Sequence, residues 1–165
     1  MIVVSDTSPI CYLVLIEAID LLPQLYGQVI IPQAVRSELA ASGAPPILQE
    51  WINNPPPWLI VQSLEVVNDQ SLTTLDFGER HAISLAEKLK ADLIILDERE
   101  ARKVAASKSL KVIELLGVLY QAALGDLIEL AESIERLRKT NFRASSSLLD
   151  ILLTRYQNEF NNRDL

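Results

Sequence analysis

The sequence predicts an α/β protein in which helices cover both faces of a mostly parallel sheet. Short runs of branched apolar residues alternate with segments of helical periodicity over residues 1–114. These runs are apolar on both faces, which is typical of buried parallel strands. Residues 115–165 show helical periodicity with no strand signal. We therefore predict a core at 1–114 and a C-terminal helical extension at 115–165 that packs on the same domain.

The first strand is expected at 2–4, where Ile-Val-Val is apolar on both faces. A helix should follow, because Ser8 offers a hydroxyl cap and Pro9 suits the first helical position. Apolar residues at helical spacing continue to about residue 25, and Val-Ile-Ile at 29–31 predicts the second strand.

The remaining core elements follow the same alternation. Pro32 opens a helix that should run to about Ser42. Prolines frame a short helix within 45–57, and Leu-Ile-Val at 59–61 predicts the third strand. The last core elements are a helix at about 78–90, a strand at 93–96, a helix at about 98–108 and a strand at 112–113.

Two aspartates directly follow predicted strands. Asp6 lies between the first strand and the first helix, and Asp97 lies between the fourth strand and a charged helix. Ligands of open α/β sheets bind at the carboxyl ends of strands, so both positions suit a binding site. For Asp6 alone, a role in capping the helix is an equally good explanation. Because both Asp6 and Asp97 occupy such a position, capping explains the pair less well than a shared binding site does.

Two glutamates lie on the apolar faces of predicted helices. Glu38 is three residues after Val35 and four after Ala34, so it shares their face. Glu79 is four residues before Ile83 and shares its face. A buried carboxylate is costly unless something satisfies it. Taken singly, Glu38 could reach the rim, and Glu79 could be favoured by the positive end of its helix.

Convergence of these four acids on one crevice explains them better than four separate structural roles. Oxygen ligands without cysteine, and with a single histidine in the chain, fit a hard cation such as Mg²⁺ or Mn²⁺. Carboxylate-held metals can activate water for attack on a phosphodiester. The pattern therefore predicts a metal-assisted phosphodiesterase site.

Four short motifs, taken in order, resemble the PIN-domain nucleases and in particular their VapC-like branch. They are DTS at 6–8, VRSEL at 35–39, GERHAISLA at 78–86 and LIILDEREARKVA at 93–105. The resemblance implies a Rossmann-like (PIN) three-layer sandwich and metal-dependent cleavage of RNA. The VapC-like branch supplies the toxins of many prokaryotic toxin–antitoxin pairs, so a small antitoxin protein is an implied partner.

The resemblance also implies the catalytic, metal-binding residues, which are Asp6, Glu38, Glu79 and Asp97. Thr7 or Ser8 would support the first acid. Many family members carry aspartate where Glu79 stands, which leaves the metal position there less fixed. Glu98 is either a fifth acid or a solvated residue of the first helical turn.

Three basic residues follow Asp97 and could contact RNA phosphates: Arg99, Arg102 and Lys103. A solvated helix face explains them equally well. His81 is expected on the surface rather than in the chemistry, because it lies on a different helix face from Glu79.

The tail has more apolar positions than one buried face requires: Leu116, Leu119, Leu127, Ile128, Leu130 and Ile134. A homodimer interface or a groove for an antitoxin helix would use them. Terminal helices that simply cover the sheet are the alternative.

Composition bears on the possible partners and location of the protein. The net charge of −7 argues against a protein that coats nucleic acid non-specifically. We expect a cytoplasmic protein, because no secretion signal or membrane span is apparent and Cys11 is the single cysteine. Two alternatives stay open: a catalytically silent PIN module that binds RNA or protein, and a receiver- or phosphatase-like domain with Asp6 as phospho-acceptor.

Overall fold

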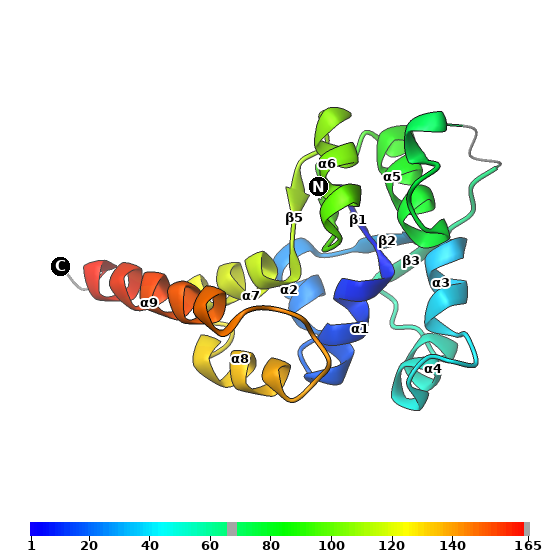
Figure 1. The fold of residues 1–165 in the computed structure, drawn as a ribbon. Coiled ribbons are helices and arrows are strands. Elements are labelled where there is room, and N and C mark those ends of the chain that lie inside the picture. The colour runs from blue at the N-terminus through cyan, green and yellow to red at the C-terminus, as the bar shows by residue number, and fades with distance from the viewer. Residues whose placement is uncertain (66–68, 164–165) are drawn as a thin grey trace. The chain divides into compact units, whose positions relative to one another are not determined.

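The computed structural model describes residues 1–65 and 69–163 (Figure 1). The chain forms two compact units, an N-terminal unit at Met1–Leu115 and a C-terminal unit at Leu116–Leu165. Within the described ranges, each helix is too short or too polar to cross a lipid bilayer.

A five-stranded sheet with the order β3-β2-β1-β4-β5 lies at the centre of the N-terminal unit. Its strands are β1 (Val3–Ser5), β2 (Val29–Pro32), β3 (Leu59–Gln62), β4 (Leu93–Ile95) and β5 (Val112–Ile113). All four neighbouring pairs are parallel. The predicted α/β class with a parallel sheet is confirmed.

The strand order changes direction between β1 and β4. From β1 the chain adds β2 and β3 on one side, then crosses to add β4 and β5 on the other. Such a switch point leaves a crevice at the carboxyl ends of the two central strands, where open α/β sheets bind ligands. Asp6 follows β1 directly, and Asp97 lies two residues after β4.

The first helical segment differs from the prediction at both its start and its middle. The helix α1 (Thr7–Leu15) begins with Asp6 at its N-cap position, so the predicted Ser8 cap is wrong. Pro9 falls later in the first turn, where a missing N–H is still tolerated. Glu17 adopts a left-handed φ of 60°, which separates α1 from α2 (Leu21–Tyr26).

The other helices of the N-terminal unit lie close to their predicted positions. They are α3 (Gln33–Leu39), α4 (Pro46–Asn53), α5 (Phe77–Leu89) and α6 (Arg99–Ser107), with a 3₁₀ turn η1 at Gln70–Leu72. The helix α3 ends before the predicted Ser42, since Ala40 is already its C-cap. The helix α5 packs against β1, β2 and β4 and also against α3, beside which it lies in Figure 1.

The tail forms α7 (Leu115–Leu124), α8 (Leu130–Arg138) and α9 (Ser146–Arg163). Most of the apolar residues that we expected to be in surplus are buried, namely Leu116, Leu119, Leu130 and Ile134. Leu127 is exposed and Ile128 is half-buried. Exposed apolar side chains occur instead on α9, at Leu148, Ile151 and Phe160.

Candidate active site

Asp6 is held at the switch point by its backbone, while its carboxylate remains incompletely satisfied. Its N–H donates to the carbonyl of Ile95 at 3.0 Å, which ties the end of β1 to β4. Although Asp6 occupies the N-cap position of α1, its side chain makes no capping hydrogen bond. The residue is only 4% exposed, and its buried Oδ1 has no hydrogen-bond partner. Capping therefore does not explain this aspartate.

The surroundings of Asp6 favour its neutral form. Burial is the main cause that raises the pKa of this carboxyl to about 8; the negative charges of Asp76, Glu79 and Glu38 contribute to the rise, whereas the N–H of Thr7 opposes it. Three of the acids predicted as site residues therefore interact electrostatically, since the charges of Glu38 and Glu79 both raise the pKa of Asp6.

Glu38 is held by groups from two other helices. Its Oε2 accepts a short hydrogen bond from the Thr7 hydroxyl at the start of α1. Its Oε1 accepts from the N–H of Gly78 at 2.9 Å, in the first turn of α5. Thr7, predicted to support Asp6, supports Glu38 with its hydroxyl. Ser8 lies next to it in the first turn of α1.

Gly78 allows this approach because it has no side chain. A Cβ at this position would lie 2.5 Å from Oε2, 2.6 Å from Oε1 and 2.7 Å from Cδ of Glu38. Its three nearest atoms would all belong to that carboxylate, at distances that a real Cβ does not tolerate. The Gly78 contact depends on two segments forty residues apart in the chain, so sequence reasoning missed it.

Glu79 and Asp76 form a reciprocal capping box at the start of α5. The N–H of Glu79 donates to Asp76 Oδ1 at 2.8 Å, and the N–H of Asp76 donates to Glu79 Oε2 at 3.0 Å. Burial is the main cause that raises the pKa of Glu79 to about 7, and the charges of Asp76 and Glu98 add to it. Asp76 was missed, although its D-x-x-E spacing is a capping-box signal.

The Asp97 side chain is oriented by the backbone of Leu115, the first residue of α7. Its Oδ1 accepts from the N–H of Leu115 at 2.8 Å, while its buried Oδ2 has no partner. Burial raises the pKa of Asp97 to about 6; the N–H of Leu115 lowers it, Glu114 raises it and Arg102 lowers it.

Three of the residues after Asp97, namely Glu98, Arg102 and Lys103, contact other protein groups. Arg102 donates from Nε to the Asp97 carbonyl at 3.1 Å and pairs with Glu114, so part of its guanidinium is already engaged. Glu98 caps α6 by accepting from the N–H of Ala101 at 2.8 Å. Lys103 is exposed and pairs with Glu100, and Arg99 is exposed at the start of α6.

The donor chemistry of these residues fits a hard divalent cation. All the candidate ligands are carboxylates, and Asp6 and Asp97 each present a buried oxygen that lacks a partner. Over residues 1–65 and 69–163, however, no three acidic, histidine or cysteine side chains form a group ready to hold a metal. The charge of Asp97 interacts with Glu114 and Arg102 rather than with the three linked acids.

A family model described as PIN domain matches residues 2–158. No curated protein and no solved structure matches the chain. The matched range extends past residue 114 and includes α7, α8 and most of α9.

Proposed function

The chain belongs to the PIN-domain family, a family of nucleases, and from this premise we propose that it is a metal-dependent endoribonuclease. PIN nucleases typically use divalent metal ions, and Mg²⁺ or Mn²⁺ is the cofactor that we propose here. The proposed substrate is RNA in single-stranded form, and the proposed location of the protein is the cytoplasm.

The pair of unpartnered oxygens at the switch point carries the proposal. Asp6 Oδ1 and Asp97 Oδ2 are both buried, and they belong to residues at the ends of the adjacent strands β1 and β4. Leaving a buried polar group unsatisfied costs about 1–3 kcal/mol. A cation bound between neighbouring strand ends would satisfy both oxygens and would offset the repulsion that the linked acids exert on Asp6.

A bound divalent cation supplies a water of lowered pKa and a positive charge for the phosphate oxygens. Asp6 and Asp97 would bind it, with Asp97 oriented by the N–H of Leu115. Glu38 would complete the site directly or through water, fixed in place by Thr7 and Gly78. Glu79 would do the same from the first turn of α5.

We expect cleavage of defined single-stranded RNAs in manganese and none in chelator, because the cation supplies the reactive water. Each of Asp6→Asn, Asp97→Asn, Glu38→Gln and Glu79→Gln should lower the rate by about 100-fold or more, the scale of losing one group that stabilises the transition state. Gel analysis of end-labelled RNA measures the rate.

Glu50→Gln is the matched control, since this exposed glutamate lies on α4. It should cleave at the wild-type rate. Wild-type rates in all four amide variants would contradict the proposed site. A wild-type chain that binds these RNAs and cuts none with either metal would favour the silent binding module instead.

We further propose that the chain is the toxin of a toxin–antitoxin pair and forms a homodimer. The ordered resemblance of its motifs to the VapC-like branch supports the first part, and the exposed Leu148 and Ile151 of α9 support the second. Induced expression of the chain should arrest growth, and co-expression of a small protein encoded next to its gene should relieve the arrest.

The homodimer is tested by light scattering, which should give the mass of two copies. A monomer at high concentration would contradict the dimer.

A further inference from the structure

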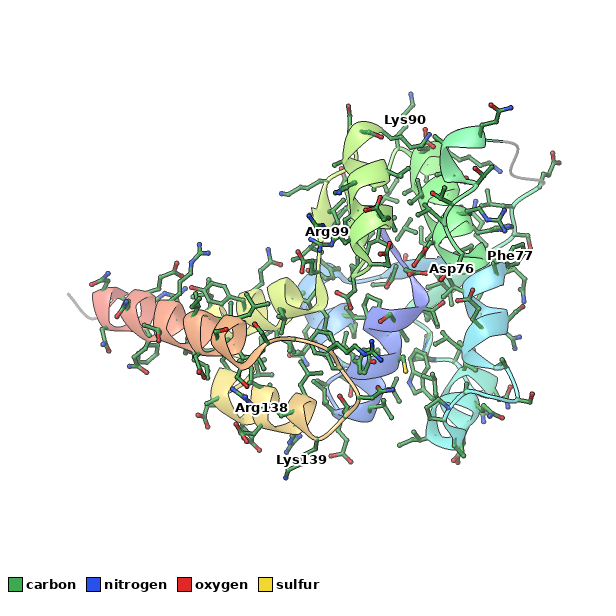
Figure 2. The ribbon with its side chains drawn as sticks, viewed as in Figure 1. Asp76, Phe77, Lys90, Arg99, Arg138 and Lys139 are labelled. Atoms are coloured by element: carbon green, nitrogen blue, oxygen red, sulfur yellow. The ribbon has the colours of Figure 1, made fainter. Side chains whose placement is uncertain are left out.

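A large aromatic side chain is exposed immediately beside the site. Phe77 is the first residue of α5, and its side chain is 54% exposed. Its neighbours along the chain are Asp76 and Gly78, which bind Glu79 and Glu38 respectively. Figure 2 shows Phe77 next to Asp76 at the start of α5, close to α3. Phe77 therefore lies in the chain between two residues that hold site acids, with its side chain exposed to solvent.

The Phe77 ring is accompanied by a second ring and a cation. The imidazole of His81 lies 4.2 Å from it, centroid to centroid, at an interplanar angle of 47°. The guanidinium carbon of Arg80 is 5.8 Å from the ring centroid, within the range of a cation–π contact. Arg80 Nε also donates to the carbonyl of Asp76 at 3.4 Å. These contacts hold the ring in position and still leave more than half of the side chain exposed.

An exposed aromatic ring with an adjacent arginine is a recurrent means of binding single-stranded nucleic acid. Bases stack on the ring, and the cation meets the phosphate backbone. Such a contact suits this chain, because its 22 acidic residues against 15 basic ones give a net charge of −7, which disfavours binding a polyanion by charge alone. Stacking supplies affinity that does not depend on net positive charge.

We propose that Phe77 is a stacking platform for one base of a single-stranded RNA, beside the nucleotide whose phosphodiester is cut. Arg80 contributes its guanidinium to the backbone of the same strand, and His81 keeps the ring in its orientation. This inference rests on the proposed function for the identity of the ligand. It assigns Phe77 a role in substrate binding and none in the chemical step.

The test measures binding in an Asp6→Asn background, where the RNA stays intact. Fluorescence anisotropy with a short single-stranded RNA should show about tenfold weaker binding for Phe77→Ala, the scale of one lost base–aromatic stack. Phe77→Trp should bind at least as tightly as Phe77 itself, because indole stacks as well. Ile47→Ala, at an equally exposed apolar position on α4 (51%), should bind unchanged.

RNAs that each carry a single abasic residue distinguish stacking from other effects. One abasic position should weaken binding to the Phe77 protein by about the same factor, and should cause no further loss in Phe77→Ala. Equal affinities for Phe77 and Phe77→Ala, or additive losses at every abasic position, would overturn the inference. The binding assay does not depend on cleavage. Absence of RNA cleavage by the wild type would therefore contradict the proposed function without bearing on the role of Phe77 in binding.

Discussion

The Asp6→Asn protein is expected to lose RNA cleavage and, without divalent cation, to be more stable than the wild type at pH 8. Asp6 is buried beside other acids, and its pKa rises from 3.8 to about 8. An asparagine has nearly the same shape and carries no charge. The substitution therefore removes a buried carboxylate that the metal-free fold accommodates only at a cost.

The pH dependence of this effect has a definite sign. Because the pKa of Asp6 is higher in the folded chain, the folded state binds more protons than the unfolded state between about pH 4 and pH 8. Its contribution to stability is greatest below pH 4 and is lost as the pH rises toward 8. A pKa shift of one unit corresponds to about 1.4 kcal/mol. With the repulsion shared among several acids, we expect Asp6→Asn to gain about 2 kcal/mol at pH 8 and little at pH 4.

Manganese should reverse the ranking of the two proteins. A cation that binds only the folded state stabilises it by mass action, so the wild type should gain more than Asp6→Asn. If Asp6 served only to cap α1, the substitution should cost about 1 kcal/mol in chelator and leave the manganese shift unchanged. Thermal unfolding at pH 4 and pH 8, in chelator and in manganese, measures both quantities, with Glu50→Gln as the control. An equal manganese shift in wild type and Asp6→Asn would mean that Asp6 is not a ligand.

The sheet could be predicted from the sequence because its strands are apolar on both faces, and few other structures bury such runs. The positions of β1 and β4 then place Asp6 and Asp97 at one edge. The ends of the first helical segment could not be predicted in the same way. Periodicity continues through Glu17, whereas its left-handed φ depends on the packing of the surrounding chain.

The acids of the site stood out because two of them directly follow predicted buried strands and the other two lie on apolar helix faces, where carboxylates are unusual. What holds them could not be predicted, since it depends on contacts across the fold. Glu38 is fixed by Thr7 and Gly78, which are 31 and 40 residues away in the chain. The state of Asp97 could likewise not be predicted, because it depends on the fold: the N–H of Leu115 binds its Oδ1, and its Oδ2 has no hydrogen-bond partner.

Gly78→Ala should sharply reduce cleavage with little change in the stability of the fold. The new Cβ would overlap the Glu38 carboxylate, which is the mobile end of a long side chain and can turn away. Turning away breaks its hydrogen bonds to Gly78 and to Thr7. The better helix propensity of alanine, up to about 1 kcal/mol, offsets part of that loss. We expect a stability change of less than about 1 kcal/mol and a cleavage rate about 10- to 100-fold lower, as for the loss of a supporting partner at a metal site.

Glu38→Ala provides the second arm of a double-mutant cycle, because it removes the atoms that the new Cβ would meet. In that background, Gly78→Ala should stabilise the protein by up to about 1 kcal/mol, because alanine has the better helix propensity and no Glu38 carboxylate remains for its Cβ to displace. It should also cause no further loss of cleavage, because the group that it displaces is already absent. Chemical denaturation and single-turnover cleavage of the four proteins give both coupling energies. If Gly78→Ala lowered the rate by the same factor with and without Glu38, the glycine would act on the reaction by some route other than placing the Glu38 carboxylate.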